Sequence, residues 1–98
     1  MVEKFSTPAE VLRPDPEVVA ERVQDETVLV HLQTNRIYAL NRTAGRAWEL
    51  LAQGRPRPAI HEQIMREFDV SSEQLDDDLR SLFSSLSSEG LIRSDESA

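Results

Sequence analysis

The sequence predicts an α+β domain in which a small antiparallel sheet precedes three helices. Residues 17–40 hold three short apolar segments separated by turn residues, which is typical of strands joined by hairpins. Residues 44–89 instead repeat apolar residues at intervals of three and four, which is typical of helices. Three strands followed by three helices predict a sheet with helices packed on one face.

Composition limits the possible classes of function. The chain has 98 residues, enough for one domain, and a net charge of −7. A phosphate backbone repels an acidic protein, so we expect no nucleic-acid partner. No apolar run approaches the roughly 20 residues that span a bilayer, and no signal peptide is recognisable. The absence of cysteine excludes disulfides. We expect a cytoplasmic monomer that does not enter membranes.

Prolines set the first domain boundary. Three prolines within residues 1–16 prevent a helix there, so we expect an extended N-terminal arm. Its apolar residues leave two alternatives open, an arm packed on the domain or a loose terminus. We expect the folded domain over residues 17–93 and a loose tail over residues 94–98.

The predicted sheet is a meander of three strands, residues 17–23, 26–32 and 36–40. The middle strand is apolar on both faces, which favours a central position. Asn35 tolerates the left-handed conformation, and this favours a three-residue loop with a bulge at Asn35. In that register Val30 pairs with Tyr38. A two-residue turn would reverse the faces, so whether Tyr38 faces the core or a ligand stays open.

Two helices are expected directly after the sheet, over residues 44–53 and 58–68. Asn41 or Thr43 is placed to cap the first helix, and Gly54 is placed to end it. The buried residues expected in these helices are Ala44, Ala47, Trp48, Leu51, Ile60, Ile64 and Phe68.

The third predicted helix covers residues 72–89. Ser71 and Gln74 form a capping box before it. Its core stripe is Leu75, Leu79, Leu82 and Leu86. Phe83 lies beside this stripe, and Asp76 and Arg80 lie further round on the same flank.

No constellation for catalysis or metal binding is recognisable. Neither His31 nor His61 has a second histidine or a carboxylate at metal-ligand spacing. The HExxH pattern that starts at His61 fails at its last position, Met65. The serines of the third helix have no base partner. We therefore expect a protein that is not an enzyme and holds no cofactor or metal.

The edge of the last predicted strand is the candidate binding surface. Strand 36–40 has one charge and no proline, so little protects its edge from pairing. A peptide can add to such an edge, with helix 72–89 as the second wall of a groove and Phe83 at its floor. The alternative is that this helix or the arm already covers the edge, and the residues alone do not decide. The candidate contact residues are Asn35, Arg36, Ile37, Tyr38, Ala39, Leu40, Leu75, Asp76, Leu79, Arg80 and Phe83.

Residues 29–45, LVHLQTNRIYALNRTAG, resemble the PqqD-like family, whose pattern is roughly L-L-D-x-x-T-G-x-x-Y-x-L-N-x-T-A/G. The likeness extends over about residues 14–93. The family is the RiPP recognition element, with three strands and three helices arranged as in a winged helix-turn-helix. The resemblance implies a non-catalytic protein that binds the leader segment of a ribosomally made precursor peptide. The leader would add as a fourth strand beside strand 36–40, in the groove with helix 72–89.

The resemblance also implies delivery of the precursor to maturation enzymes. These are a leader peptidase and a cyclase for lasso peptides, or a radical SAM enzyme for pyrroloquinoline quinone. His31 stands where the family often has Asp, which we expect to change the surface offered to the enzyme. The TNRIYALNRTAG run is more similar to a lasso-peptide member. The alternative is a winged-helix DNA-binding regulator, which the acidic start of the third helix, SSEQLDDD, argues against.

Overall fold

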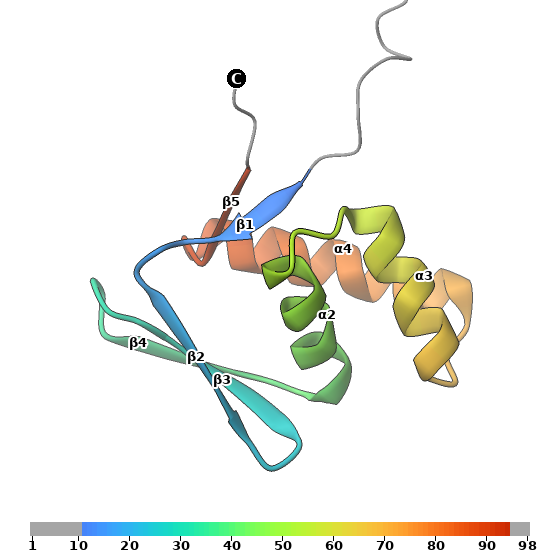
Figure 1. Ribbon diagram of the computed structural model, residues 1–98, viewed down its shortest axis with the longest axis horizontal. Helices are drawn as coiled ribbons and strands as arrows, with labels where there is room; N and C mark the ends of the chain where they lie inside the picture. Colours follow the sequence, from blue (N-terminus) through green and yellow to red (C-terminus); the bar gives the residue numbers. More distant parts are fainter. Residues whose placement is uncertain (1–10, 95–98) are drawn as a thin grey trace, which may run out of the picture.

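The computed structural model describes residues 11–94 and confirms the predicted α+β class (Figure 1). The elements in chain order are β1 (Leu12–Pro14), β2 (Val18–Val23), β3 (Glu26–His31), β4 (Arg36–Leu40), α2 (Arg42–Ala52), α3 (Arg57–Glu67), α4 (Ser72–Ser88) and β5 (Ile92–Ser94). The three helices gather on one side of the β2–β3–β4 sheet. The predicted strands and helices therefore form in the expected order.

The β2–β3–β4 sheet is an antiparallel meander with β3 in the centre. Its register differs by one residue from the predicted one, because Leu29, and not Val30, pairs with Tyr38. Four residues, from Leu32 to Asn35, separate the closing pair of the hairpin, so the predicted three-residue loop is wrong. Asn35 does adopt the left-handed conformation, with φ 62°.

The face of the sheet that meets the helices follows from this register. Side chains alternate along a strand, so the buried Thr27, Leu29 and His31 of β3 share one face. Their partners on β4 include Leu40, which is buried, and Tyr38, which is half-buried against the core. Tyr38 thus faces the helices, which answers the question that the sequence left open.

The helices begin and end at the signals in the sequence. The side chain of Asn41 accepts the N–H of Ala44 at 2.9 Å, so Asn41 is the cap of α2. Ser71 accepts the N–H of Gln74 at 3.1 Å at the start of α4. Gly54, with φ 87°, follows α2 in the left-handed conformation that a residue with a side chain rarely adopts.

A second sheet, which the sequence analysis did not predict, joins the two ends of the described chain. β1 and β5 pair antiparallel, with Leu12 opposite Ser94 and Pro14 opposite Ile92. Leu12 and Ile92 are both buried. The division into an arm, a domain and a tail stays a prediction, since residues 1–10 and 95–98 lie outside the described residues. Ser94, however, belongs to a strand and not to a loose tail.

Candidate functional site

Strand β4 lies at one edge of its sheet. Within residues 11–94 it pairs with β3 on one side and with no strand on the other. Arg36, Tyr38 and Leu40 point towards the helices, while Ile37 and Ala39 point away from them. In the described part of the chain, the free edge of β4 therefore has backbone groups available for pairing with an added strand.

One end of β4 is tied to the end of α4 by a carboxylate. The hydroxyl of Tyr38 donates to Glu89 Oε1 at 2.8 Å, and Arg36 Nη1 donates to the same oxygen at 3.0 Å. Tyr38, and then Glu89, hold the pKa of Arg36 above its ordinary value. Glu89 is the C-cap residue of α4. These contacts place the last turn of α4 beside the first half of β4.

A groove of about 400 Å³ lies at the other end of β4, between the start of α2 and the middle of α4. Its lining residues are Asn41, Thr43, Ala44, Asp78, Leu79, Ser81, Leu82 and Ser85. The lining combines a few apolar side chains with hydroxyls and one carboxylate. Asp78, Leu82, Ser85 and Glu89 are four, three and four residues apart, so they share one flank of α4. This flank is the wall of α4 that faces β4.

The structure separates the predicted contact residues into two groups. Asn35 to Leu40 lie in β4 and its hairpin loop, as expected. Leu75 is fully buried, and Leu79 borders the groove. Asp76, Arg80 and Phe83 lie instead on the opposite flank of α4, with Arg57 and His61 of α3, around a separate cavity of about 600 Å³.

Phe83 is therefore not the floor of a groove beside β4. Its ring is 3% exposed, and the guanidinium of Arg57 lies 4.8 Å from the ring centroid. Asp76 pairs with Arg80 at 2.9 Å on the surface of α4. Five residues of α4 that line the groove or contact β4 are not among the predicted contact residues: Asp78, Ser81, Leu82, Ser85 and Glu89. The leucine spacing places Leu82 in the core stripe, whereas its side chain is half-buried and borders the groove.

His31 is also placed differently from the expectation. It is 5% exposed, and its Nδ1 accepts the N–H of Gln33 at 3.2 Å. The imidazole therefore orders the start of the hairpin loop before β4. A side chain buried to this degree offers little surface to a partner enzyme.

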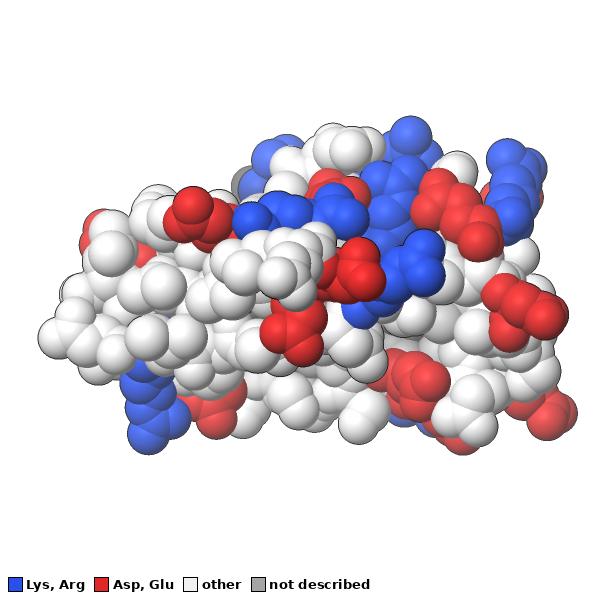
Figure 2. All heavy atoms as spheres, turned by 90° about the horizontal axis from the view of Figure 1, so that it is seen from below, with Lys and Arg blue, Asp and Glu red and all other residues white. Residues whose placement is uncertain are grey.

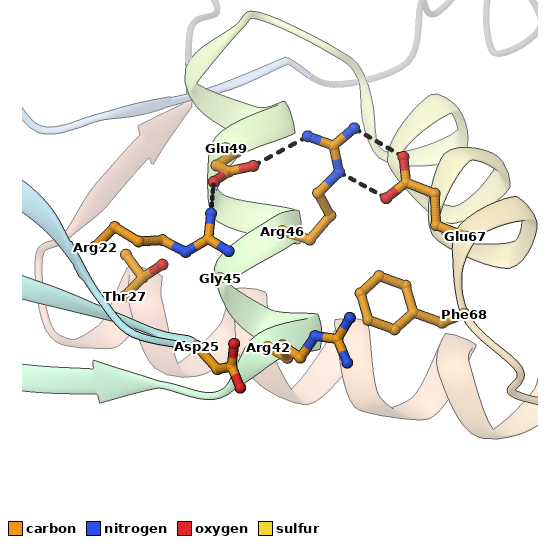
Figure 3. A pocket seen from close by; sticks show the side chains of 9 residues that line it. All are labelled: Arg22, Asp25, Thr27, Arg42, Gly45, Arg46, Glu49, Glu67 and Phe68. Carbon is orange, nitrogen blue, oxygen red and sulfur yellow. Dashed lines mark hydrogen bonds and ion pairs between the residues drawn. The ribbon is translucent and has the colours of Figure 1, made fainter.

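A third cavity, of about 180 Å³, is bounded by an ion-pair network (Figure 3). Arg46 of α2 binds both carboxylate oxygens of Glu67 at 2.8 Å, and it also binds Glu49 at 3.0 Å. Arg22 of β2 reaches Glu49 at 3.3 Å. The hydrogen bonds from Arg46, and then from Gln63, lower the pKa of Glu67 to about 2. The network joins β2, α2 and α3, and its charges are largely satisfied internally.

The described residues show no cluster of three or more residues that could ligate a metal ion. Figure 2 shows basic side chains gathered in the middle of the face seen from below, with acidic side chains directly beside them. A duplex-binding surface is normally a patch or stripe of Lys and Arg, whereas here carboxylates lie among the basic side chains. None of the helices within residues 11–94 is long and apolar enough to cross a membrane.

Comparison with known proteins gives matches to one family and to two solved structures. The family model of coenzyme PQQ synthesis protein D (PqqD) matches residues 26–92. A structure described as "TbiB1 in Complex with the TbiA(beta) Leader Peptide" superposes with a TM-score of 0.78 at 29% identity, over 88% of this chain and 99% of that chain. A second, "Lasso peptide synthetase B1 complexed with the leader peptide", gives a TM-score of 0.76 at 22% identity, over 85% and 98%. No curated protein matches the chain significantly.

Proposed function

Since the chain belongs to the PqqD family, we propose that it binds the leader segment of a ribosomally made precursor peptide. The observation that carries the proposal is the free edge of β4 beside a groove walled by α4. A similar protein of the same fold, TbiB1, has been solved with a leader peptide bound. The leader would add to β4 as a further strand and place alternate side chains in the groove.

The groove suggests which leader side chains fit. Leu79, Leu82 and Ala44 provide apolar contact, surrounded by hydroxyl groups. Asp78 is the one charged residue of the lining, and no cation lines this groove. We therefore expect an apolar leader side chain at the centre, with a neutral or basic neighbour near Asp78.

The role after binding is delivery, and the chain has no catalytic part in it. We infer that the bound precursor is presented to maturation enzymes, with a leader peptidase and a cyclase of a lasso peptide favoured over a radical SAM enzyme. The TNRIYALNRTAG run supports this order. Because ribosomes make such precursors in the cytoplasm, the proposed function places the protein there.

Backbone methylation of the leader tests the strand addition directly. A short precursor peptide encoded near the gene is sought, and its synthetic leader is labelled and titrated against the full chain by fluorescence anisotropy. We expect a dissociation constant in the micromolar range or tighter. A strand added at an edge donates alternate N–H groups to it, so N-methylation at successive leader positions should weaken binding at every second position.

A variant of the chain completes this test. Ile37→Pro removes a backbone N–H from the free edge of β4, because the backbone groups of Ile37 face away from β3 whereas those of Tyr38 face Leu29. This variant should abolish binding provided that circular dichroism shows the fold retained. Equal affinity of a folded Ile37→Pro variant, or a methylation profile without the two-residue period, would show that the leader does not pair with β4.

A further inference from the structure

The outer face of the β2–β3–β4 sheet is unusually apolar. Alternation along the strands turns eight side chains away from the helices: Val19, Glu21, Val23, Glu26, Val28, Val30, Ile37 and Ala39. Six of these eight residues are apolar. An antiparallel sheet with one face in water normally has polar residues on that face. The left half of Figure 2, where Figure 1 places the sheet, is correspondingly mostly uncharged.

The largest apolar side chains on this face lie in one row across the sheet. Val19 pairs with Val30, and Val30 pairs with Ile37. Val19 is 47% exposed and Ile37 is 69% exposed. All the large apolar residues exposed within residues 11–94 belong to this sheet or its hairpin loop. A contiguous apolar patch of this kind commonly marks a surface that binds another protein.

The charges on the outer face have one sign. Glu21 and Glu26 are its charged residues, and neither makes an ion pair or a side-chain hydrogen bond within the described chain. The arginines of β2 and β4 point the other way, where Arg22 pairs with Glu49 and Arg36 with Glu89. The outer face is thus an apolar row accompanied by two unpaired negative charges.

We propose that the outer face of the β2–β3–β4 sheet docks the enzyme that acts on the bound precursor. The complementary surface of that enzyme is apolar opposite Val19, Val30 and Ile37, and it has Lys or Arg opposite Glu21 and Glu26. This inference rests on the proposed function, which leaves the outer face open because the leader occupies the edge of β4 and the groove with α4.

Charge favours an enzyme over a second copy of the chain as the occupant. Packing two copies face to face would bring the unpaired Glu21 and Glu26 of both chains into one interface, between molecules that each have a net charge of −7. Like charges buried together without partners oppose association. An enzyme surface with Lys or Arg among apolar residues would instead pair with Glu21 and Glu26.

The test measures enzyme binding and leader binding separately on the full chain. A leader peptidase and a cyclase encoded near the gene are sought, purified and titrated by biolayer interferometry, with and without the leader. The variant is Val19→Ser with Glu21→Lys, which lies on β2 and away from the edge of β4. Its enzyme affinity should fall at least about tenfold, while its leader affinity stays unchanged. The wild-type affinity for the enzyme should also fall with added salt.

A charge-matched control is Glu62→Lys on the exposed surface of α3, which should bind the enzyme as the wild type does. Wild-type enzyme affinity in the β2 variant, or no enzyme binding by the wild type in either condition, overturns the proposal. A wild-type dimer in sedimentation that the β2 variant dissociates also overturns it, in favour of a second copy. If the wild type binds the enzyme but not the leader, the proposed function is refuted, and the enzyme titration still tests the docking surface on its own.

Discussion

The hydroxyl of Tyr38 and the carboxylate of Glu89 are joined by a hydrogen bond of 2.8 Å, although 51 residues separate them in sequence. Arg36 binds the same carboxylate oxygen at 3.0 Å. The side chains of two β4 residues therefore set how close the strand lies to the end of α4. The proposed groove lies towards the other end of β4, beside Asn41.

Removing the Tyr38 hydroxyl should have a small effect on stability. Tyr38→Phe deletes one partly exposed hydrogen bond, so we expect the free energy of unfolding to fall by about 0.5–1 kcal/mol in urea denaturation. In a Glu89→Ala background the same change should cost much less, since its acceptor is already absent. Equal losses in both backgrounds would mean that the hydroxyl contributes through another contact.

The flank of α4 proposed to contact the leader can be tested with two adjacent serines. Ser85 lines the groove beside β4, whereas Ser84 is exposed on the surface of α4 and lines no part of that groove. Ser85→Arg should fill the groove and weaken leader binding at least about tenfold, measured by fluorescence anisotropy. Ser84→Arg should leave the affinity within about twofold of the wild type.

A variant on the opposite flank of α4, which carries Arg80, shows which result would contradict this prediction. If Arg80→Ala weakens leader binding and Ser85→Arg does not, then the cavity around Phe83, and not the groove beside β4, receives the leader. Arg80 is exposed and pairs with Asp76 and Asp77 on the surface, so its removal should leave the fold intact.

A side chain at position 45 should destabilise the fold. A Cβ added to Gly45 would lie 2.6 Å from Oγ1 of the buried Thr27 and 3.2 Å from its Cβ. Gly45→Ala gains up to about 1 kcal/mol of helix propensity. We expect the overpacking cost of about 1–3 kcal/mol to outweigh this gain, so the urea midpoint should fall.

A compensating change identifies the cause of that loss. Thr27→Ala removes the oxygen nearest to the added methyl group, so the Gly45→Ala variant should lose less stability in a Thr27→Ala background. If Gly45→Ala raises the urea midpoint in the wild-type background, α2 and β3 are not in the close contact described.

The pair of Arg46 and Glu67 should contribute to stability in a pH-dependent way. The pKa of Glu67 falls from its ordinary 4.5 to about 2 in the folded chain. A lowered folded pKa means that the contribution is complete above about pH 4.5 and is lost as the pH falls towards about 2. Urea midpoints measured across this range should fall less steeply in Glu67→Gln than in the wild type.

Removing Arg46 tests whether the pair of Arg46 and Glu67 causes this pH dependence. Arg46 is the main cause of the lowered pKa of Glu67, so Arg46→Ala should also flatten the acid limb. Identical acid profiles in the wild type and both variants would show that the pair does not respond to pH in this way.

The elements with strong local signals could be predicted from the sequence, and those that depend on distant residues could not. Asn41 and Ser71 cap helices where their residue types indicate, and Asn35 takes the left-handed conformation expected of it. β1 and β5 are each three residues long and form only because they pair with each other, at opposite ends of the described chain. Neither Leu12–Pro14 nor Ile92–Ser94 has enough alternation to indicate a strand.

Two parts of the candidate site depend on tertiary packing that the sequence pattern does not determine. The hairpin register depends on loop length. The apolar pattern predicts Leu32 as a strand residue, whereas it begins the loop and is 54% exposed. The flank of α4 that faces β4 depends on how the helix rotates about its axis, which the core stripe fixes only approximately. The leucine spacing predicts Leu82 in the core stripe and Phe83 beside it, whereas in the structure Phe83 is buried and Leu82 lines the groove.

The pairing of Leu12 with Ser94 has a consequence for engineering. The described chain enters and leaves the fold at one point, because the first residue of β1 lies beside the last residue of β5. A short linker across this point, with new termini opened at Gly54 in the exposed connection between α2 and α3, should give a circular permutant that folds. The same adjacency suits the domain for insertion as a cassette into a loop of another protein, with β4 still free along its edge.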